Sequence, residues 1–212
     1  MSAEVNPKPH ASPLRRAQAA ATRARIAEAA AEVFATQSYD GARIEDIASA
    51  AGVAYPTVYK VFGNKRNLLK AAVDARMTGG TDGDVARQAW FREQLEAPTA
   101  EQQLRLIARN ARRLYDRAGK LLEAMRAAAA RDQEIAALLH DIHDDRLARA
   151  RTTAQRLATK TKLRTTQQET VRTLWTLTVP ELYVLQTETA GLNPDDYERW
   201  LADLLIAALL GP

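Results

Sequence analysis

The residues with the clearest chemical potential lie between Tyr55 and Lys65. Thr57, Tyr59 and Lys60 offer two hydroxyl groups and an ammonium group on the polar side of a short predicted helix. Such groups can donate hydrogen bonds to phosphate oxygens or reach base edges in a DNA major groove about 12 Å wide. Lys65 follows at the start of the next predicted helix, where free N–H groups and the helix dipole favour an anion. The segment therefore predicts a helix that contacts DNA.

Two short helices joined by a tight turn must position these side chains. Apolar residues recur with a helical period from Ile44 to Ala51, so the first helix has one face for a core. Gly52 then suits a left-handed turn, and Pro56 suits the first turn of the second helix. Gly63 ends that helix. This order of elements is the layout of a helix-turn-helix DNA-binding unit.

The segment AGVAYPTVYKVFGNK resembles the signature of TetR-like (TetR/AcrR) transcriptional regulators, and the preceding ARIAEAAAEVFATQSYDGARIEDIA resembles the first helix of that family and its link into the helix-turn-helix. The resemblance covers the first third of the chain. It implies an all-α fold with an N-terminal three-helix helix-turn-helix DNA-binding domain and a C-terminal helical ligand-binding and dimerisation domain. It also implies a set of DNA-contacting residues: Arg43, Tyr55, Thr57, Tyr59, Lys60 and Lys65.

Three positions depart from the family pattern. Basic or small residues are frequent in the family at the position of Tyr55, and glycine is common at that of Pro56. Val61 replaces an aromatic residue or a histidine that often adds a backbone contact. The base preference of this chain therefore cannot be copied from a relative.

The positive charge is concentrated near the predicted DNA-binding unit. Residues 1–70 hold ten Lys or Arg against six Asp or Glu, whereas residues 71–212 hold twenty of each. Arg15, Arg16 and Arg23 belong to a cluster without an intervening acid, which makes them candidates for a DNA-binding arm; a solvated helix face is the alternative.

The sequence divides into three predicted regions. Residues 1–19 are expected to form a disordered basic arm, because the first residues are rich in proline and poor in apolar side chains. Residues 20–70 are the predicted DNA-binding domain, and residues 71–212 the predicted effector-binding and dimerisation domain. Strong helix formers dominate that last region. We predict its helices at residues 84–96, 99–119, 132–160, 165–190 and 194–210. Gly119 is expected to close the second of these helices, and the fourth is expected to have a cap at Thr165 and a bend at Pro180.

The resemblance implies a homodimer through helices 165–190 and 194–210, which are unusually apolar for surface segments; the alternative is that they are simply core. It also implies a small-molecule effector between the middle helices. For most of the candidate lining residues, the alternative to contacting the effector is packing in the core. Their composition suggests a largely apolar effector. They are Trp90, Leu104, Ile107, Tyr115, Met125, Leu139, Ile142, Trp175 and Tyr183.

Other chemistry has weak support. His140 and His143 lie three residues apart near aspartates, but HDIHDD also suits an exposed helix side, so no metal site is predicted. The chain has no cysteine, no phosphate-binding glycine loop and no nucleophile elbow, so neither an enzyme nor a cofactor is predicted. No run of apolar residues is long enough to span a membrane, and no export signal is recognisable, so we expect a cytoplasmic, nucleoid-associated protein.

Together these features predict a dimeric repressor that binds a near-palindromic double-stranded DNA operator and is released by a small, largely apolar effector. Two alternatives remain at this level. One is a TetR-like activator or an effector-independent DNA-binding protein, and the other is a helical metal-dependent enzyme.

Overall fold

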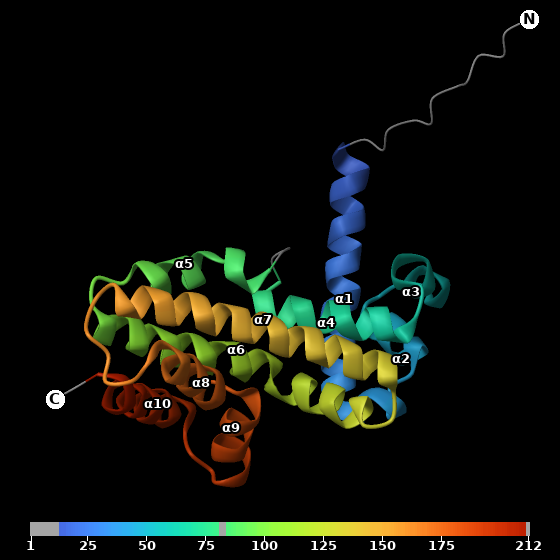
Figure 1. Cartoon of the computed structure of the whole chain (residues 1–212). Helices are drawn as coiled ribbons and strands as arrows, with labels where there is room; N and C mark the ends of the chain where they lie inside the picture. Colours follow the sequence, from blue (N-terminus) through green and yellow to red (C-terminus); the bar gives the residue numbers. More distant parts are fainter. Residues whose placement is uncertain (1–12, 81–83, 211–212) are drawn as a thin grey trace, which may run out of the picture.

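The computed structural model describes residues 13–80 and 84–210, which are helical and contain no strand, as the all-α prediction requires (Figure 1). None of the helices in these two ranges is both long and apolar enough to cross a membrane. The elements in chain order are α1 (Pro13–Gly41), α2 (Ile44–Ala50), α3 (Tyr55–Phe62), α4 (Lys65–Thr78), η1 (Val85–Arg87), α5 (Ala89–Glu96), α6 (Ala100–Ala129), α7 (Gln133–Ala158), α8 (Gln167–Leu177), α9 (Pro180–Val184), η2 (Leu185–Thr189) and α10 (Pro194–Leu209).

The first helix starts earlier than the sequence suggested. Residues 13–19, predicted as part of a disordered arm, form the exposed first turns of α1 and project beyond the rest of the fold (Figure 1). The prediction of disorder for residues 1–12 lies outside the described residues. Further along α1, Ile26, Ala30 and Phe34 are fully buried, so this half of the helix packs into the core. Helix α1 therefore combines an exposed N-terminal part with a packed C-terminal part.

The apolar periodicity of the helix-turn-helix is confirmed. Ile44 and Ile47 of α2 are buried, and so are Val58 and Phe62 of α3. Gly52 adopts a positive φ of 63° in the turn between the two helices, a conformation that costs glycine little. The turn thus allows α3 to leave α2 at an angle while both keep one face on the same core.

Helix α4 connects the N-terminal helices to the rest of the molecule. The Asn64 side chain caps it by accepting a hydrogen bond from the backbone N–H of Asn67 at 2.8 Å. The helix runs without a break through the predicted domain boundary between residues 70 and 71, and Ala72 and Val73 just after that boundary are buried. One rigid element therefore belongs to both predicted domains.

The long helices α6 and α7 form the body of the C-terminal part, with α5 on one side and α10 on the other (Figure 1). Gly119 does not end a helix as predicted, because α6 continues through it to Ala129. Instead, a Cβ atom at position 119 would lie 3.2 Å from Cγ2 of Val184 in α9. The glycine thus permits the close approach of α9 to α6.

The penultimate helical segment also differs from its prediction. The cap lies one residue later than expected, because Thr166 and Glu169 form a reciprocal capping box in place of Thr165 with Gln168. Pro180 does not merely bend a helix over residues 165–190. Val179 is extended at the break between α8 and α9, and α9 continues directly into the single π-helical turn η2. Proline lacks the N–H that would continue the hydrogen bonding of α8.

Candidate nucleic-acid interface and internal cavity

Helix α3 presents a polar and aromatic face to solvent. Tyr55 and Tyr59 are 40% and 44% exposed, with their ring centroids 5.1 Å apart in an edge-on arrangement. A side-chain hydrogen bond with Tyr59 raises the pKa of Tyr55 to about 12. Lys60 is exposed on the same helix, and Thr57 is half-buried. The structure therefore brings these four predicted residues together on one short helix.

The opposite face of α3 is fixed to α1. The guanidinium group of Arg23 lies 4.5 Å from the centre of the Phe62 ring, and its Nη1 donates a hydrogen bond to the backbone oxygen of Val61 at 3.2 Å. Arg23, a candidate arm residue, is thus engaged with the end of α3. Arg15 and Arg16 lie on the exposed turns of α1 that extend away from this contact.

The two remaining candidate DNA contacts flank α3. Arg43 is exposed at the N-cap of α2, with its Nε 3.8 Å from a carboxylate oxygen of Glu45. Lys65 is only half-exposed, because its Nζ lies 4.7 Å from the centre of the Tyr39 ring and donates to the Asp40 backbone oxygen at 3.5 Å. This burial lowers the pKa of Lys65. Lys65 therefore connects α4 to the end of α1 and is less available to DNA than Lys60.

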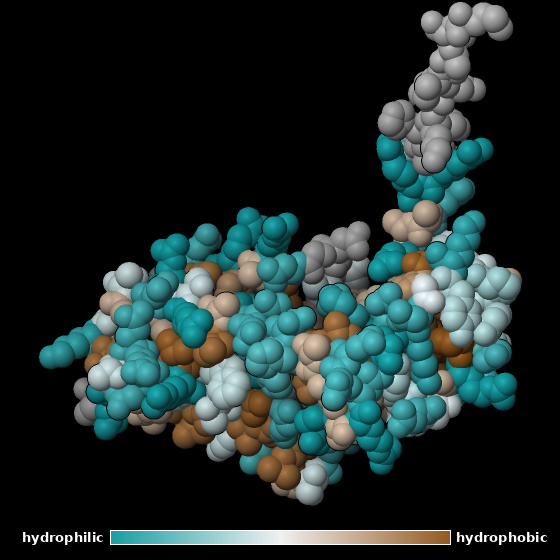
Figure 2. Space-filling view, turned by 45° about the vertical axis from the view of Figure 1, so that its right-hand side comes forward, coloured by the Kyte–Doolittle hydropathy of each residue, from teal (hydrophilic) through white to brown (hydrophobic). Residues whose placement is uncertain are grey.

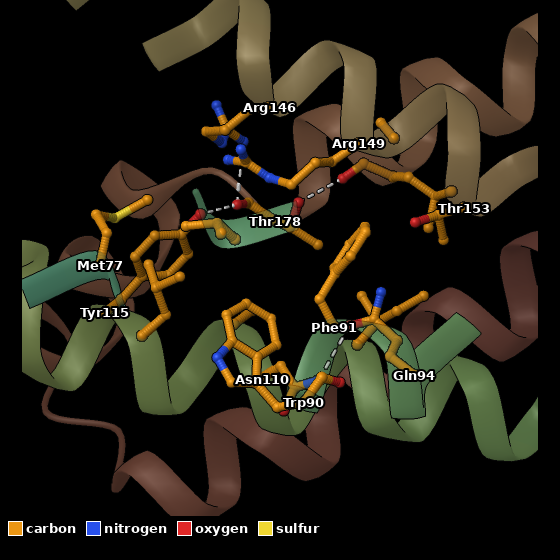
Figure 3. A pocket seen from close by; sticks show the side chains of 16 residues that line it. Met77, Trp90, Phe91, Gln94, Asn110, Tyr115, Arg146, Arg149, Thr153 and Thr178 are labelled. Carbon is orange, nitrogen blue, oxygen red and sulfur yellow. Dashed lines mark hydrogen bonds between the residues drawn. The ribbon is translucent and has the colours of Figure 1, made fainter. Parts of the chain in front are cut away.

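A cavity of about 90 Å³ lies among α5, α6, α7 and α8 (Figure 3). Its walls combine aliphatic and aromatic side chains with a set of polar groups. The lining residues are Met77, Val85, Trp90, Phe91, Gln94, Ile107, Asn110, Ala111, Leu114, Tyr115, Arg146, Arg149, Ala150, Thr153, Leu174 and Thr178.

Three of the nine predicted pocket residues line this cavity: Trp90, Ile107 and Tyr115. Leu104 and Met125 are fully buried on other parts of α6 and belong to the packed core. Their periodicity gave the correct buried face of the helix but could not show which turns of that face meet a void.

The other four predicted pocket residues also lie outside the cavity. Tyr183 packs edge-on against Tyr197, with ring centroids 5.0 Å apart, and its hydroxyl donates to Asp116. Leu139 and Ile142 are partly buried against the core, and Trp175 has a solvent-exposed surface on α8. These four residues do not line this cavity, and whether they contact an effector stays a prediction.

Sequence reasoning missed the polar part of the cavity. Asn110 donates to Gln94 at 3.1 Å, and the Tyr115 hydroxyl donates to the Thr178 backbone oxygen at 2.6 Å. Arg146 donates to the same oxygen at 3.0 Å and to the backbone oxygen of Trp175 at 2.8 Å. These carbonyl groups lie at the end of α8, where an intrahelical partner is lacking.

One sequence signal could have found this polar wall. Arg146, Arg149 and Thr153 recur along α7 at spacings of three and four residues, which places them on one face of the helix. Ala150 and Ala154 are buried on the same side. Polar side chains within a buried helical stripe indicate an internal polar site.

The paired histidines are arranged as surface residues. His140 is exposed, with its Nε2 3.6 Å from a carboxylate oxygen of Asp144. His143 packs near Trp175, and partial burial lowers its pKa. Residues 13–80 and 84–210 contain no group of three or more His, Cys, Asp or Glu side chains placed to hold a metal ion.

The C-terminal helices leave apolar side chains exposed. Trp175 of α8, Leu185 of η2 and Trp200 of α10 are among the large hydrophobic residues with substantial exposure. In Figure 2, brown surface gathers in the lower part of the view, at the level where Figure 1 shows α8, α9 and α10. Exposed large apolar side chains of this kind make these helices candidates for an interaction surface.

Comparison with known proteins supports the assignment of the N-terminal part. Residues 26–72 match the family model of the bacterial regulatory proteins of the tetR family. The uncharacterized HTH-type transcriptional regulator YezE of Bacillus subtilis (strain 168) is 35% identical over 69 residues, which is 32% of this chain and 32% of that protein. The match thus spans about a third of the curated relative.

Solved structures share the fold over nearly the whole chain. The SmeT–triclosan complex has a TM-score of 0.69 and 22% identity, covering 90% of this chain and 92% of SmeT. The transcriptional regulator FadR from Bacillus subtilis in complex with stearoyl-CoA has a TM-score of 0.65 and 18% identity, covering 87% of this chain and 97% of FadR. The similarity extends the shared architecture from the helix-turn-helix to the C-terminal helices.

Proposed function

Because this chain belongs, through its N-terminal domain, to the TetR family of transcriptional regulators, we propose that it is a dimeric repressor whose operator binding is released by a small molecule. Residues 20–70 bind the operator, and residues 71–212 bind the effector and dimerise. The observation that carries this function is the exposed face of α3, where hydroxyl groups and a lysine are held outward by a buried apolar base.

That face suits a DNA major groove. An exposed α-helix fits the groove, phenol and threonine hydroxyls can donate to phosphates or bases, and Lys60 supplies a positive charge. Because α3 is fixed through Phe62 and Arg23, little conformational freedom is lost when it docks. Arg43 at the start of α2 adds a second cation at the edge of the same unit.

Dimerisation would follow from the exposed apolar side chains of α8, η2 and α10. A twofold-related copy would cover Trp175, Leu185 and Trp200, removing their apolar surface from water. It would also supply a second copy of α3, and two such helices about 34–36 Å apart read a near-palindromic site. Leu185→Glu should therefore give a monomer with weak operator binding, measured by sedimentation velocity and by binding to DNA.

The effector role rests on the cavity and on the neighbours. SmeT and FadR have been solved with triclosan and stearoyl-CoA, respectively. The cavity here touches α6, α7 and α8 and lies close to α4 through Met77, so a bound molecule would contact the helix that leads to the DNA-binding unit. Ligand binding would shift α4 and change the separation of the two α3 helices.

The experiment that tests this function is selection of bound fragments from a random DNA pool, followed by a salt titration on the selected duplex. A near-palindromic duplex whose binding weakens steeply with salt is the expected result. A pool without enrichment would overturn the DNA-binding function. Effector-dependent release from the same duplex would then separate a ligand-controlled repressor from an effector-independent binder.

Point variants connect that binding to α3. Tyr59→Phe and Lys60→Ala should each weaken operator binding by about 1–3 kcal/mol while leaving the fold intact. Lys162→Ala is the matched control for charge, because Lys162 is an exposed lysine in the C-terminal part. Equal affinities for all three variants and the parent chain would contradict the assignment of the α3 face.

A further inference from the structure

The internal cavity has an unbalanced charge. Two arginines of α7, Arg146 and Arg149, contribute to its wall, and no aspartate or glutamate is among its lining residues in the described part of the chain. Figure 3 shows both arginine side chains at the same end of the cavity, above Thr178. The opposite walls are formed by aromatic and aliphatic groups that include Trp90 and Phe91. The cavity is therefore cationic at one end, and elsewhere it combines aromatic and aliphatic walls with the hydrogen-bonded amides of Asn110 and Gln94.

The two arginines differ in how their charges are satisfied. Arg146 is buried and donates to the carbonyl groups of Trp175 and Thr178, so it serves the end of α8. Arg149 forms no hydrogen bond or ion pair with the residues of 13–80 and 84–210. Asp145 lies one turn earlier on the same helix, but no ion pair joins the two residues.

The environment of Arg149 disfavours an isolated cation. Burial lowers the pKa of its guanidinium group, and the positive charge of Arg146 lowers it further. Tyr115, Asp145 and Asp84 act in the opposite direction without forming an ion pair with it. Arg149 is partly buried, and a partly desolvated charge without an ion-pair partner in the described part of the chain gains from a ligand that supplies one.

Resting on the effector role proposed above, we infer that the effector is a small apolar monocarboxylate, whose carboxylate pairs with Arg149 and whose body packs against Trp90, Phe91 and Tyr115. An arginine side chain matches a carboxylate because its planar fork can donate two parallel hydrogen bonds. Arg146 stays on its two carbonyl groups and adds long-range attraction for the same anion. The ligand thus receives its charge recognition from a residue that has no ion-pair partner among residues 13–80 and 84–210.

The size of the cavity restricts the body of the ligand. A cavity of about 90 Å³ is smaller than the roughly 150 Å³ cavity that holds benzene in a protein core. A compact ring or a short branched chain therefore fits after modest opening, and a long acyl chain does not. Three aromatic walls favour a flat ring.

The test compares probes that share a body and differ in charge. Benzoate, phenylacetate and cyclohexanecarboxylate are titrated into the full-length protein by calorimetry, beside benzamide, benzyl alcohol and benzylamine. The expected result is binding of at least one carboxylate about 10- to 100-fold tighter than its neutral or cationic analogue, as a charge-assisted hydrogen-bonded pair provides. Equal binding of carboxylate and amide, or no binding of any carboxylate at millimolar concentration, would overturn the inference.

Two variants assign the effect to one side chain. Arg149→Gln should remove the preference for the carboxylate, whereas Arg151→Gln, which removes an equal charge from an exposed position on α7, should keep it. If both variants retain the preference, Arg149 is not the partner and the inference fails. Thermal unfolding of Arg149→Gln without ligand shows whether this variant is folded. Carboxylate binding by a second variant, Arg149→Lys, which has a shorter side chain, gives a second measure of the role of residue 149.

The same proteins separate this inference from the proposed function. Operator binding without ligand depends on α3 and should be the same for the parent chain, Arg149→Gln and Arg151→Gln. Normal operator binding with no carboxylate preference would overturn only the ligand class. Failure to bind any DNA, with carboxylate binding intact, would overturn the regulator and leave the anion site standing.

Discussion

Nε of Arg66, in the first turn of α4, donates a hydrogen bond to Oδ2 of Asp132 at 2.8 Å. The other oxygen of Asp132 accepts from the backbone N–H groups of Glu134 and Ile135, which makes this carboxylate the N-cap of α7. One side chain therefore starts a helix of the C-terminal part and holds the helix that leads to the DNA-binding unit.

This relationship predicts a pH dependence. The hydrogen bond from Arg66, followed by the backbone N–H groups, lowers the pKa of Asp132 below its ordinary value of 3.8. A lowered pKa in the folded state means that the stabilisation is complete above about pH 5 and is lost as the pH falls through the ordinary value toward the lowered one. Asp132→Asn should therefore destabilise the protein at pH 7, and the difference from the parent chain should shrink below pH 4. Urea unfolding across that pH range measures it, and a difference independent of pH would contradict this account.

A second prediction concerns the close packing at Gly119. Gly119→Val should destabilise the protein by about 1–3 kcal/mol, because the added methyl groups meet Val184 where even a Cβ atom would lie 3.2 Å away. Ala127→Val, at an exposed position on the same helix, is the control. Val184→Ala should restore part of the stability lost by Gly119→Val, as measured by thermal unfolding. If Val184→Ala restores no stability to Gly119→Val, the strain does not arise from the contact between residues 119 and 184.

A third prediction concerns the attachment of α3. Arg23→Gln removes a cation from the face of the Phe62 ring and a donor from the Val61 carbonyl group. We expect faster amide exchange in α3 without DNA and weaker operator binding than in Arg25→Gln, which removes the same charge from an exposed position two residues later. Equal exchange rates in the two variants would show that Arg23 contributes only its charge.

A fourth prediction concerns the carbonyl group at the end of α8. Tyr115→Phe deletes the donor that lies 2.6 Å from the Thr178 oxygen while Arg146 continues to donate to it. The expected cost is about 0.5–1.5 kcal/mol, because the acceptor keeps one partner. A protein of this size then unfolds about 2–4 °C lower for each kcal/mol lost. A cost above that range would show that the Tyr115 hydroxyl has a further role.

The elements that the sequence predicted well are those decided by neighbouring residues. The stripe from Ile44 to Ala51, the turn at Gly52 and the Asn64 cap depend on local periodicity and on the conformations that glycine and asparagine favour. The exposed face of α3 follows from the same periodicity. Such features need no knowledge of distant helices.

The features that the sequence left open depend on partners far along the chain. The sequence predicts a helix end at Gly119, but in the structure α9 packs closely against this glycine. The role of Arg146 depends on carbonyl groups that the break before Pro180 leaves without an intrahelical partner. Leu104 and Met125 are buried like Ile107, but only Ile107 meets the void. Which part of an apolar face lines a cavity is a property of the packed helices together.

The cavity has two kinds of lining residue: those that donate a hydrogen bond to the Thr178 backbone oxygen and those that do not. The difference matters for redesign of the cavity as a sensor. Tyr115 and Arg146 both donate to this oxygen, so changing either alters the end of α8 and, with it, the apolar surface that α8 shares with α10. Trp90 and Phe91 belong to the short helix α5 on the other side of the cavity. Mutant libraries confined to α5 should therefore change ligand choice without altering the end of α8, whereas libraries that include Tyr115 or Arg146 should change ligand recognition and the end of α8 together.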